Sequence, residues 1–328
     1  MSRRPARHLA WLPGAAVSAL ALAALARLAD WPRVWRAWQE LSPAFAGLLW
    51  GLFLVSMLTR VAAWRVMLGG KVSFGRALLA LNEGYLLNNV FPLRAGELGR
   101  AFLLGERSGL GAFFVASTIV IERVFDLALA AAVLLSTLPL ALAADWAAPA
   151  ALTTLVAASA ALSLLYLAAR HRSRWTPRLY RTLSRWPPLR DALWPRLEST
   201  LDGFALLTRP RAFLLAFGGM ALTWGLAIVE YTLAARFFVP SLPWWSGAFI
   251  LGAAAAGVAL PSAPASLGVF EAAVVGAFSL LGVPLEPALA CAVLLHLLHF
   301  ATTMLIGSYA LLKDGETLTG LWRKVAEG

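Results

Sequence analysis

Charged side chains and cysteine are both scarce in this chain of 328 residues. Only 14% of the residues are charged, whereas 60% are hydrophobic, and the mean hydropathy is +0.73. A soluble domain is usually about half apolar and about a quarter charged. Because Cys291 is the single cysteine, an intrachain disulfide is excluded, and its place in an apolar run indicates an inert, packed side chain. The composition therefore predicts a membrane protein with several spans.

The glycine-rich signatures of nucleotide-binding and hydrolytic enzymes are missing as well. The sequence has no P-loop, no dinucleotide-binding fingerprint, no G-x-S-x-G elbow and no clustered metal ligands. We therefore expect no catalytic residue, no cofactor and no metal. ATP-driven transport by this chain alone is disfavoured for the same reason.

Acidic residues are fewer than basic ones, which gives a net charge of +11. In a membrane protein this excess indicates positive-inside bias and attraction to anionic lipid headgroups rather than nucleic-acid binding. Residues 170–211 hold ten arginines against three acids, so this loop and the N-terminus are expected to be cytoplasmic. Leucines at helical spacing in the loop predict amphipathic surface helices, which anchor the orientation or recruit anionic lipid.

Six apolar stretches are long enough to cross a bilayer as helices. The first is preceded by Arg3, Arg4 and Arg7, as in a signal peptide, but the repeat described next needs it as an uncleaved helix. The six spans are expected at 9–28, 43–64, 111–142, 148–169, 212–239 and 287–312.

A proline–glycine break occurs twice with the same spacing. Residues 92–99 and 261–268 both read P-x-x-x-x-x-L-G and lie between short apolar runs. Charge parity makes the first segment enter and leave on the cytoplasmic side and the second on the outer side. The expected fold is one all-α polytopic domain over 1–328, with about six transmembrane helices and two re-entrant helix pairs. Its inverted-topology repeats, about 9–143 and 148–312, resemble the architecture of many secondary transporters.

Polar residues gather around the first break. Non-helical backbone survives in a membrane only beside protein or a wet cavity, so each break predicts a polar interior. Arg94 and Arg100 suit bidentate contact with a lipid phosphate, and Glu97 can pair with either; a solvated cytoplasmic turn is the alternative. Four polar side chains before the break either face the substrate or satisfy the broken backbone: Asn82, Glu83, Asn88 and Asn89.

Charged residues also interrupt the third span. Glu122, Arg123 and Asp126 lie within 111–142, and Arg123 and Asp126 are three residues apart, which allows them to pair on one helix face. Intramembrane charges are functional candidates by default. We expect Arg123 to contact phosphate, while Glu97, Glu122 and Asp126 orient the arginines or bind a cationic headgroup; a structural ion pair is the alternative.

The second break has a different set of polar residues. Ser262, Ser266 and Glu271 flank it, and the last span contains His296 and His299. Histidine is a plausible proton carrier, and interhelical hydrogen bonding is the alternative for both rings. Glu271, or Glu230 in the fifth span, is a candidate for coupling transport to protons; the sequence does not choose between them.

Three motifs carry a family resemblance. They are N-E-G-Y-L-L-N-N-V-F-P-L-R-A-G-E-L-G-R-A (82–101), I-E-R-V-F-D (121–126) and L-P-S-A-P-A-S-L-G-V-F-E-A (260–272). Over about residues 9–312 the chain resembles the transmembrane, flippase-like domain of lysylphosphatidylglycerol synthases and its stand-alone relatives. In the full synthase this part is linked to moving the aminoacylated lipid, and a separate cytosolic domain performs aminoacyl transfer. Only a short tail follows Leu312, so we expect the transferase domain to be absent, and the resemblance implies lipid translocation or lipid binding. The expected location is the bacterial inner membrane, with both termini cytoplasmic because of the arginine placement.

The functional expectation is a lipid flippase-like transporter without enzyme activity. It would move a phospholipid or lipid-linked headgroup through a polar cavity between the two re-entrant pairs, with the membrane and an anionic or lipid-linked phospholipid as partners. One alternative is an enzyme that modifies a lipid-linked substrate, with Glu83, Glu97 or Glu122 as base. Another is an accessory subunit of a lipid-synthesis enzyme.

Overall fold

The computed structural model describes residues 12–91, 95–141, 146–259 and 262–317, and this part of the chain is helical with no strand. The helices of the first half are α1 (Leu12–Leu28), α2 (Trp31–Gln39), α3 (Pro43–Met67), α4 (Phe74–Val90), α5 (Ala95–Ser108) and α6 (Ala112–Ala141). Those of the second half are α7 (Ala147–Arg170), α8 (Arg172–Leu183), α9 (Pro187–Phe204), η2 (Ala205–Thr208), α10 (Pro210–Phe238), α11 (Ser246–Ala259), η3 (Pro264–Ser266), α12 (Val269–Leu280) and α13 (Leu285–Lys313).

Five helices of the described chain are long and apolar enough to cross a membrane: α3, α6, α7, α10 and α13. The bent pair α1–α2, whose axes differ by 83°, makes a sixth candidate span. The prediction of an all-α polytopic membrane fold is confirmed, and the described spans begin and end close to the expected residues. Residues 9–11 of the first expected span lie outside the described residues.

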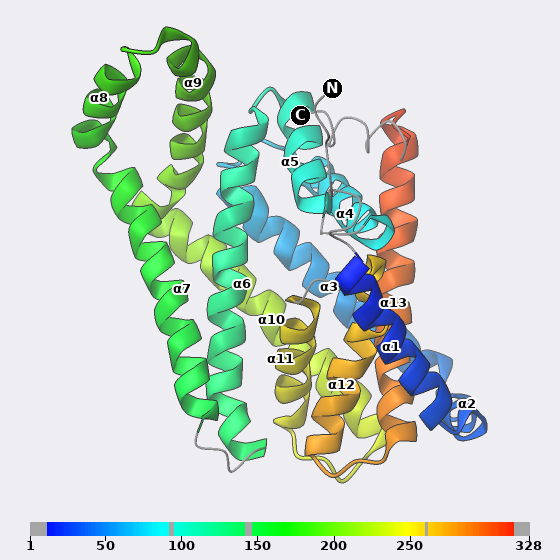
Figure 1. Cartoon of the computed structure of the whole chain (residues 1–328). Helices are drawn as coiled ribbons and strands as arrows, with labels where there is room; N and C mark the ends of the chain where they lie inside the picture. The colour runs from blue at the N-terminus through cyan, green and yellow to red at the C-terminus, as the bar shows by residue number, and fades with distance from the viewer. Residues whose placement is uncertain (1–11, 92–94, 142–145, 260–261, 318–328) are drawn as a thin grey trace, which may run out of the picture.

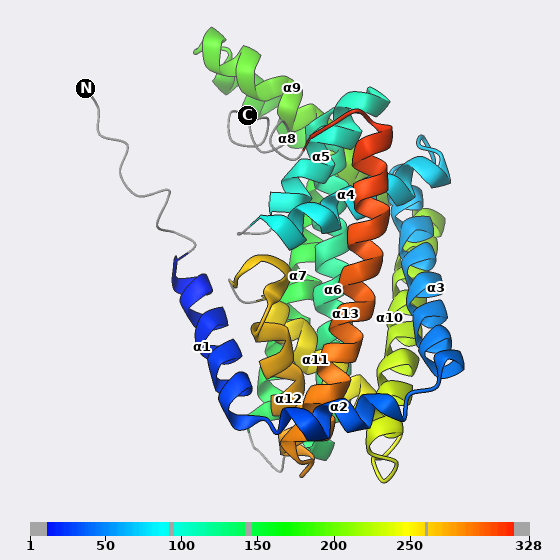
Figure 2. The same ribbon diagram turned by 90° about the vertical axis from the view of Figure 1, so that its right-hand side faces the viewer.

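Helix α2 was not predicted from the sequence. It runs across the end of the bundle rather than along it (Figure 2). The Asp30 side chain accepts a hydrogen bond from the backbone N–H of Arg33 at 3.3 Å and so caps the helix. On its inner face Val34 is buried, and the Trp38 indole donates to the carbonyl of Ala290 in α13 at 2.9 Å. This short helix therefore attaches the N-terminal segment to the end of α13.

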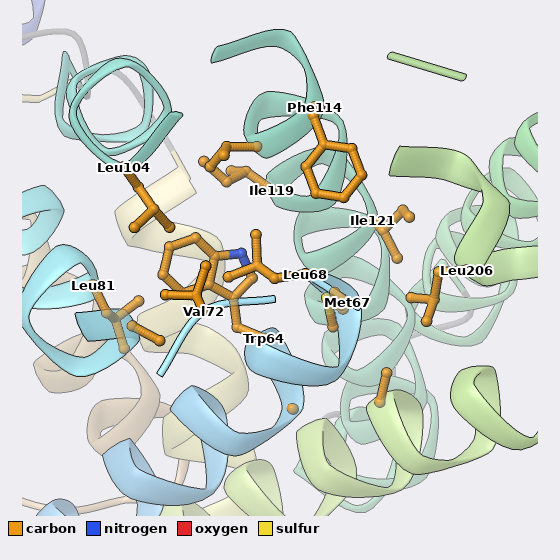
Figure 3. Close-up of a cluster of buried hydrophobic side chains, with 14 of the residues drawn as sticks. Trp64, Met67, Leu68, Val72, Leu81, Leu104, Phe114, Ile119, Ile121 and Leu206 are labelled. Atoms are coloured by element: carbon orange, nitrogen blue, oxygen red, sulfur yellow. The ribbon is translucent and has the colours of Figure 1, made fainter. Parts of the chain in front are cut away.

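The long helices pack in pairs that cross between the two halves. Helix α3 lies against α10, α4 against α13, and α6 against both α7 and α11. Figure 1 shows the α4–α5 hairpin in the upper part of the bundle and α11–α12 in the lower part. One apolar core surrounds Trp64, Leu81 and Leu104 near α4–α5 (Figure 3), and a second surrounds Phe249 and Phe278 near α11–α12. Each hairpin is thus anchored in its own core.

The basic loop forms the helices α8 and α9, which rise above α7 and α6 in Figure 1. The apolar stripe of α9 divides between two environments. Leu201 and Phe204 are buried in the core beside α6, whereas Leu189 and Leu193 are 48% and 42% exposed. Only the first part of α9 is therefore available for contact with a membrane surface.

The α4–α5 hairpin depends on two facing glycines. A Cβ on Gly96 would lie 1.9 Å from the carbonyl oxygen of Gly84 and 2.6 Å from Oδ1 of Asn88. The backbone N–H of Gly96 also donates to that Oδ1 at 2.8 Å. Backbone contact at this distance admits no side chain, so the pair sets the spacing of α4 and α5.

We expect Gly96→Ala to lower the free energy of unfolding by about 1–3 kcal/mol, because the helices must separate to admit the methyl group. The matched control is Gly75→Ala in α4, where a new Cβ meets nothing within 4 Å and alanine favours the helix. Thermal unfolding in detergent, followed by tryptophan fluorescence, measures both. Equal melting temperatures for the two variants would contradict the close packing.

Candidate functional site

A cavity of about 490 Å³ is lined by residues from both halves of the chain. Its walls come from α3, α4, α5 and α6 on one side and from α11, the second break, α12 and α13 on the other. The structure brings together eight residues expected from the sequence: Asn88, Asn89, Glu97, Arg123, Ser262, Ser266, His296 and His299. Arg94, which was also expected at this site, lies outside the described residues.

The carboxylate of Glu122 is the centre of an ion cluster beside the cavity. Its side chain is completely buried and accepts hydrogen bonds from Arg60 and Arg100 at 2.7 Å each and from Arg123 at 2.9 Å. Each partner comes from a different part of the chain: α3, α5 and the neighbouring position of α6. A buried carboxylate is tolerated when it is paired and hydrogen-bonded in this way.

Asp126 extends the cluster by one helical turn. It accepts two hydrogen bonds from Arg60, at 2.8 and 3.0 Å, and one from the indole of Trp224 in α10 at 3.0 Å. Arg123 lies 3.2 Å from the same carboxylate. The pairing of Arg123 with Asp126 was predicted from their spacing, and the structure shows it, together with the arginine of α3 that the sequence did not connect to them.

The three arginines occupy different depths. Arg100 is buried behind Glu122, with its guanidinium 4.2 Å from the ring centroid of Trp64, and it does not line the cavity. Arg123 is 37% exposed and borders the cavity, 3.6 Å from Glu97. The Nε of Arg123 has no hydrogen-bond partner among the described residues. Arg123 is therefore the cluster member best placed to meet a ligand, and Arg100 supports the cluster from behind.

Asn82 and Glu83 face away from the cavity. The Asn82 amide donates to the carbonyl of Leu78 in its own helix at 2.9 Å. Glu83 pairs with Arg107 of α5 at 3.0 Å, and Arg107 also contacts Asp314 just after α13. Glu83 thus links α4 to α5, and neither residue borders the cavity.

Asp314 joins this second ion cluster from outside the spans. Arg76 donates two hydrogen bonds to its carboxylate, at 2.7 and 2.9 Å. Partial burial alone would raise the pKa of Asp314, but a hydrogen bond with Glu83 and the charges of Arg76 and Arg107 outweigh it. The pKa therefore lies below its ordinary value of 3.8, and the carboxylate is ionised at neutral pH.

The second break is a strained turn held by hydrogen bonds. Ala265 and Ser266 have φ angles of 57° and 56°, a left-handed conformation that costs a non-glycine residue about 1–3 kcal/mol. Glu271 accepts the backbone N–H of Gly268 at 2.7 Å and contacts Nδ1 of His296. The other ring nitrogen of His296 lies 3.1 Å from the carbonyl oxygen of Ala265. One histidine thus connects both ends of the turn.

The second histidine of the last span connects other helices. Nε2 of His299 lies 2.8 Å from Glu230 in α10, and its ring stacks on Phe53 of α3 with centroids 4.1 Å apart. One turn further along α13, Thr303 accepts a hydrogen bond from Asn89 of α4 at 3.0 Å. Interhelical hydrogen bonding, one of the two readings of these histidines from sequence, is therefore present for both. Glu271 and Glu230 each pair with a different ring.

Comparison with protein families gives one matching profile. The sequence profile described as the lysylphosphatidylglycerol synthase TM region matches residues 11–307. The chain belongs to this family. Searches of curated proteins and of solved structures gave no significant match. With its spans, this member of the lysylphosphatidylglycerol synthase TM family is an integral membrane protein, as the resemblance in its three motifs implied.

Four polar residues of the cavity in this family member were not expected from the sequence: Ser56, Arg60, Tyr85 and Thr303. A signal existed for Arg60, because it lies inside the second apolar span and an intramembrane charge is a functional candidate. Arg60 lies near the end of that span, however, close to the basic residues Arg65, Lys71 and Arg76, where a solvated charge is the ordinary expectation. Ser56, Tyr85 and Thr303 give no such signal, since hydroxyl groups are common in apolar helices.

The H-x-x-H pair of this family member divides between two carboxylates. His296 contacts Glu271, and His299 contacts Glu230, so the two rings do not converge on one point. Among the described residues, no group of three histidine, cysteine or acidic side chains is placed to hold a metal ion. The side chains that line the cavity supply charge and hydrogen-bonding groups.

Proposed function

We propose that this chain is a lipid flippase-like transporter that moves a phospholipid or lipid-linked headgroup across the membrane without catalysing a reaction. The observation that carries the proposal is that a single polar cavity is lined by residues flanking both breaks. Interrupted helices in corresponding places of two halves mark the substrate site of many transporters. The cavity volume of about 490 Å³ falls within the usual range for small-ligand sites.

The helix pairing supports an inverted repeat. The helices α3, α4–α5 and α6 correspond in order to α10, α11–α12 and α13. The hairpin of each half packs against the long last helix of the other half, since α4 contacts α13 and α11 contacts α6. With 14 residues, α5 and α11 each rise only about 21 Å, too little for a hydrocarbon core of about 30 Å. This geometry favours one re-entrant hairpin from each side and rocking of the two halves.

The lining offers groups for both signs of a headgroup. Arg123 and Arg60 present guanidinium groups, which suit bidentate contact with a phosphate, and Glu97 presents a carboxylate for a cationic group. Aromatic rings from α3, α12 and α13 also border the cavity: Phe53, Phe270 and Phe300. We infer that the headgroup enters the cavity while the acyl or isoprenoid tails stay in the bilayer.

The orientation follows from charge. The basic helices α8 and α9, the α4–α5 hairpin and the C-terminal end of α13 lie at the same end of the bundle (Figure 1). Arginine-rich ends face the cytoplasm, so we place this end there and the α11–α12 hairpin toward the outside. The proposed location is the bacterial inner membrane.

The test is translocation of headgroup-labelled lipids in proteoliposomes. Vesicles with purified protein, and empty vesicles, are compared for anionic, zwitterionic and cationic headgroups by quenching the outer-leaflet label. We expect protein-dependent exchange for at least one headgroup class. Rates equal to empty vesicles for every class would overturn the proposal, and a chemically altered lipid found by mass spectrometry would favour an enzyme instead.

A further inference from the structure

We propose that His296 is a proton-binding site that couples the movement of lipid to the movement of protons. This inference rests on the proposed function and adds its energy source. It starts from one contact pattern: the His296 ring has a hydrogen-bond acceptor at each nitrogen. Nδ1 faces the carboxylate of Glu271, and Nε2 faces the carbonyl oxygen of Ala265 at 3.1 Å.

The protonation state follows from this pattern. Neutral imidazole has one N–H and one lone pair, whereas imidazolium donates from both nitrogens. With Glu271 ionised, both contacts are satisfied by imidazolium and not by a neutral ring. A neutral ring fits only when Glu271 carries the proton, so in either form the pair holds one proton. Loss of the proton to water in the cavity turns one lone pair toward an acceptor oxygen, so the contact with Glu271 or that with Ala265 is lost.

The proton therefore acts on a strained element. Ala265 and Ser266 are left-handed, and the hydrogen bonds from Gly268 through Glu271 and His296 to Ala265 close a loop around them. Because η3 packs against α4 of the other half, release of this turn changes the contact between the two hairpins. Proton binding thus stabilises one arrangement of the cavity, and proton release frees it.

The surroundings of His296 favour it as the group that gains and loses a proton on the side of the cavity formed by the second break and α13. Besides Glu271 of α12, its ring meets the aromatic rings of Phe270 and Phe300 at 4.8 and 6.4 Å. The charged and titratable groups that line the same cavity from the packed elements are Arg60 of α3, Tyr85 of α4, Glu97 of α5, Arg123 of α6 and His299 of α13. Because Arg60 and Arg123 pair with their own carboxylates, Glu271 is the acid that contacts this imidazolium.

His299 provides a matched comparison within the same helix. It is also partly buried and also contacts a carboxylate, but this hydrogen bond involves only Nε2, at 2.8 Å from Glu230. A neutral ring with the proton on Nε2 satisfies that contact. We therefore assign proton coupling to His296 and not to His299, although the two lie three residues apart.

The first experiment needs no transport. Histidine labelled with ¹⁵N is observed by NMR in protein reconstituted in nanodiscs, and the chain has four histidines, so His296→Gln and His299→Gln assign the two ring signals. We expect both ring nitrogens of His296 to be protonated at neutral pH and those of His299 to show one protonated nitrogen. A neutral His296 throughout the range in which the protein stays folded would overturn the proposal.

The second experiment measures coupling in proteoliposomes that contain a pH-sensitive dye. The rate of wild type without a pH gradient, compared with empty vesicles, tests the proposed transport function by itself. Given that activity, an imposed gradient should change the translocation rate several-fold in opposite directions for its two signs, and lipid movement should shift the internal pH. His296→Gln should lose this response and His299→Gln should keep it. A wild-type rate that ignores the gradient, or an equal loss in both variants, would overturn the coupling while leaving the transport function standing.

Discussion

Replacement of Glu122 by alanine is expected to lower the free energy of unfolding by about 3–5 kcal/mol, the usual cost of breaking a buried ion pair from one side. Glu122 has no exposed side-chain surface and accepts from Arg60, Arg100 and Arg123. Its removal leaves Arg100 buried with no other carboxylate in contact among the described residues. It also leaves Asp126 as the main counter-charge for the other two. Thermal unfolding of the detergent-solubilised protein should show a large loss of melting temperature.

The control for this prediction is the exposed pair of Arg172 and Asp202, whose shortest contact, 2.6 Å, closely matches those of Glu122. Both of its side chains are more than half exposed, so Asp202→Ala should cost at most about 1 kcal/mol. Glu122→Gln, which keeps the size but not the charge, should fall between the two. A Glu122→Ala protein as stable as Asp202→Ala would show that the cluster does not hold α3, α5 and α6 together.

Replacement of Arg123 by alanine is expected to reduce lipid translocation about tenfold to a hundredfold. This corresponds to about 1.5–3 kcal/mol for one lost charge-assisted hydrogen bond to a phosphate. The effect on stability should be much smaller than that of Glu122→Ala, because Glu122 keeps Arg60 and Arg100. Arg123→Lys keeps the charge but not the planar fork, so it should recover only part of the rate. The assay is the exchange of headgroup-labelled lipid in proteoliposomes.

The matched control is Arg172→Ala, which removes an arginine of similar exposure far from the cavity and should keep the wild-type rate. Melting temperatures of all variants separate lost contacts with lipid from lost folding. If Arg123→Ala translocates lipid as fast as Arg172→Ala, then the role of the cluster is structural. A structural ion pair between Arg123 and Asp126 was the alternative interpretation of the sequence.

Hydropathy accounts for most of what the sequence predicted correctly. The cost of burying polar backbone in lipid makes long apolar stretches helical, so the bounds of α3, α6, α10 and α13 followed closely from composition. Helix α2 was not predicted because its nine residues are too few for a span and because arginine and proline lie between its tryptophans. Whether an amphipathic helix of this length forms depends on its tertiary contacts, which for α2 are with α13.

The sequence indicated part of the cavity lining but not its arrangement. Polar residues are rare in membrane-spanning segments, so their presence alone indicated Asn88, Arg123 and His296 as candidates. Their depth was not predictable, because a step of one residue turns a helix by about 100° and moves a side chain from cavity to core. Arg100 lies behind Glu122 for this reason. The pairing of Arg60 with Asp126 depends on how α3 packs on α6, which no local pattern encodes.

In the proposed transporter, the contact between Arg123 and Glu97 affects how strongly the cavity binds an anion. At 3.6 Å it is the longest of the cluster, and it joins its two most exposed members. Glu97 therefore competes with the ligand, because a phosphate that binds Arg123 must displace the carboxylate that already pairs with this guanidinium. The affinity of the cavity is then an exchange free energy. A headgroup that also carries an amine forms two favourable contacts, one between its phosphate and Arg123 and one between its amine and the displaced Glu97. Zwitterionic and aminoacylated lipids should therefore bind more tightly than simple anions of the same size.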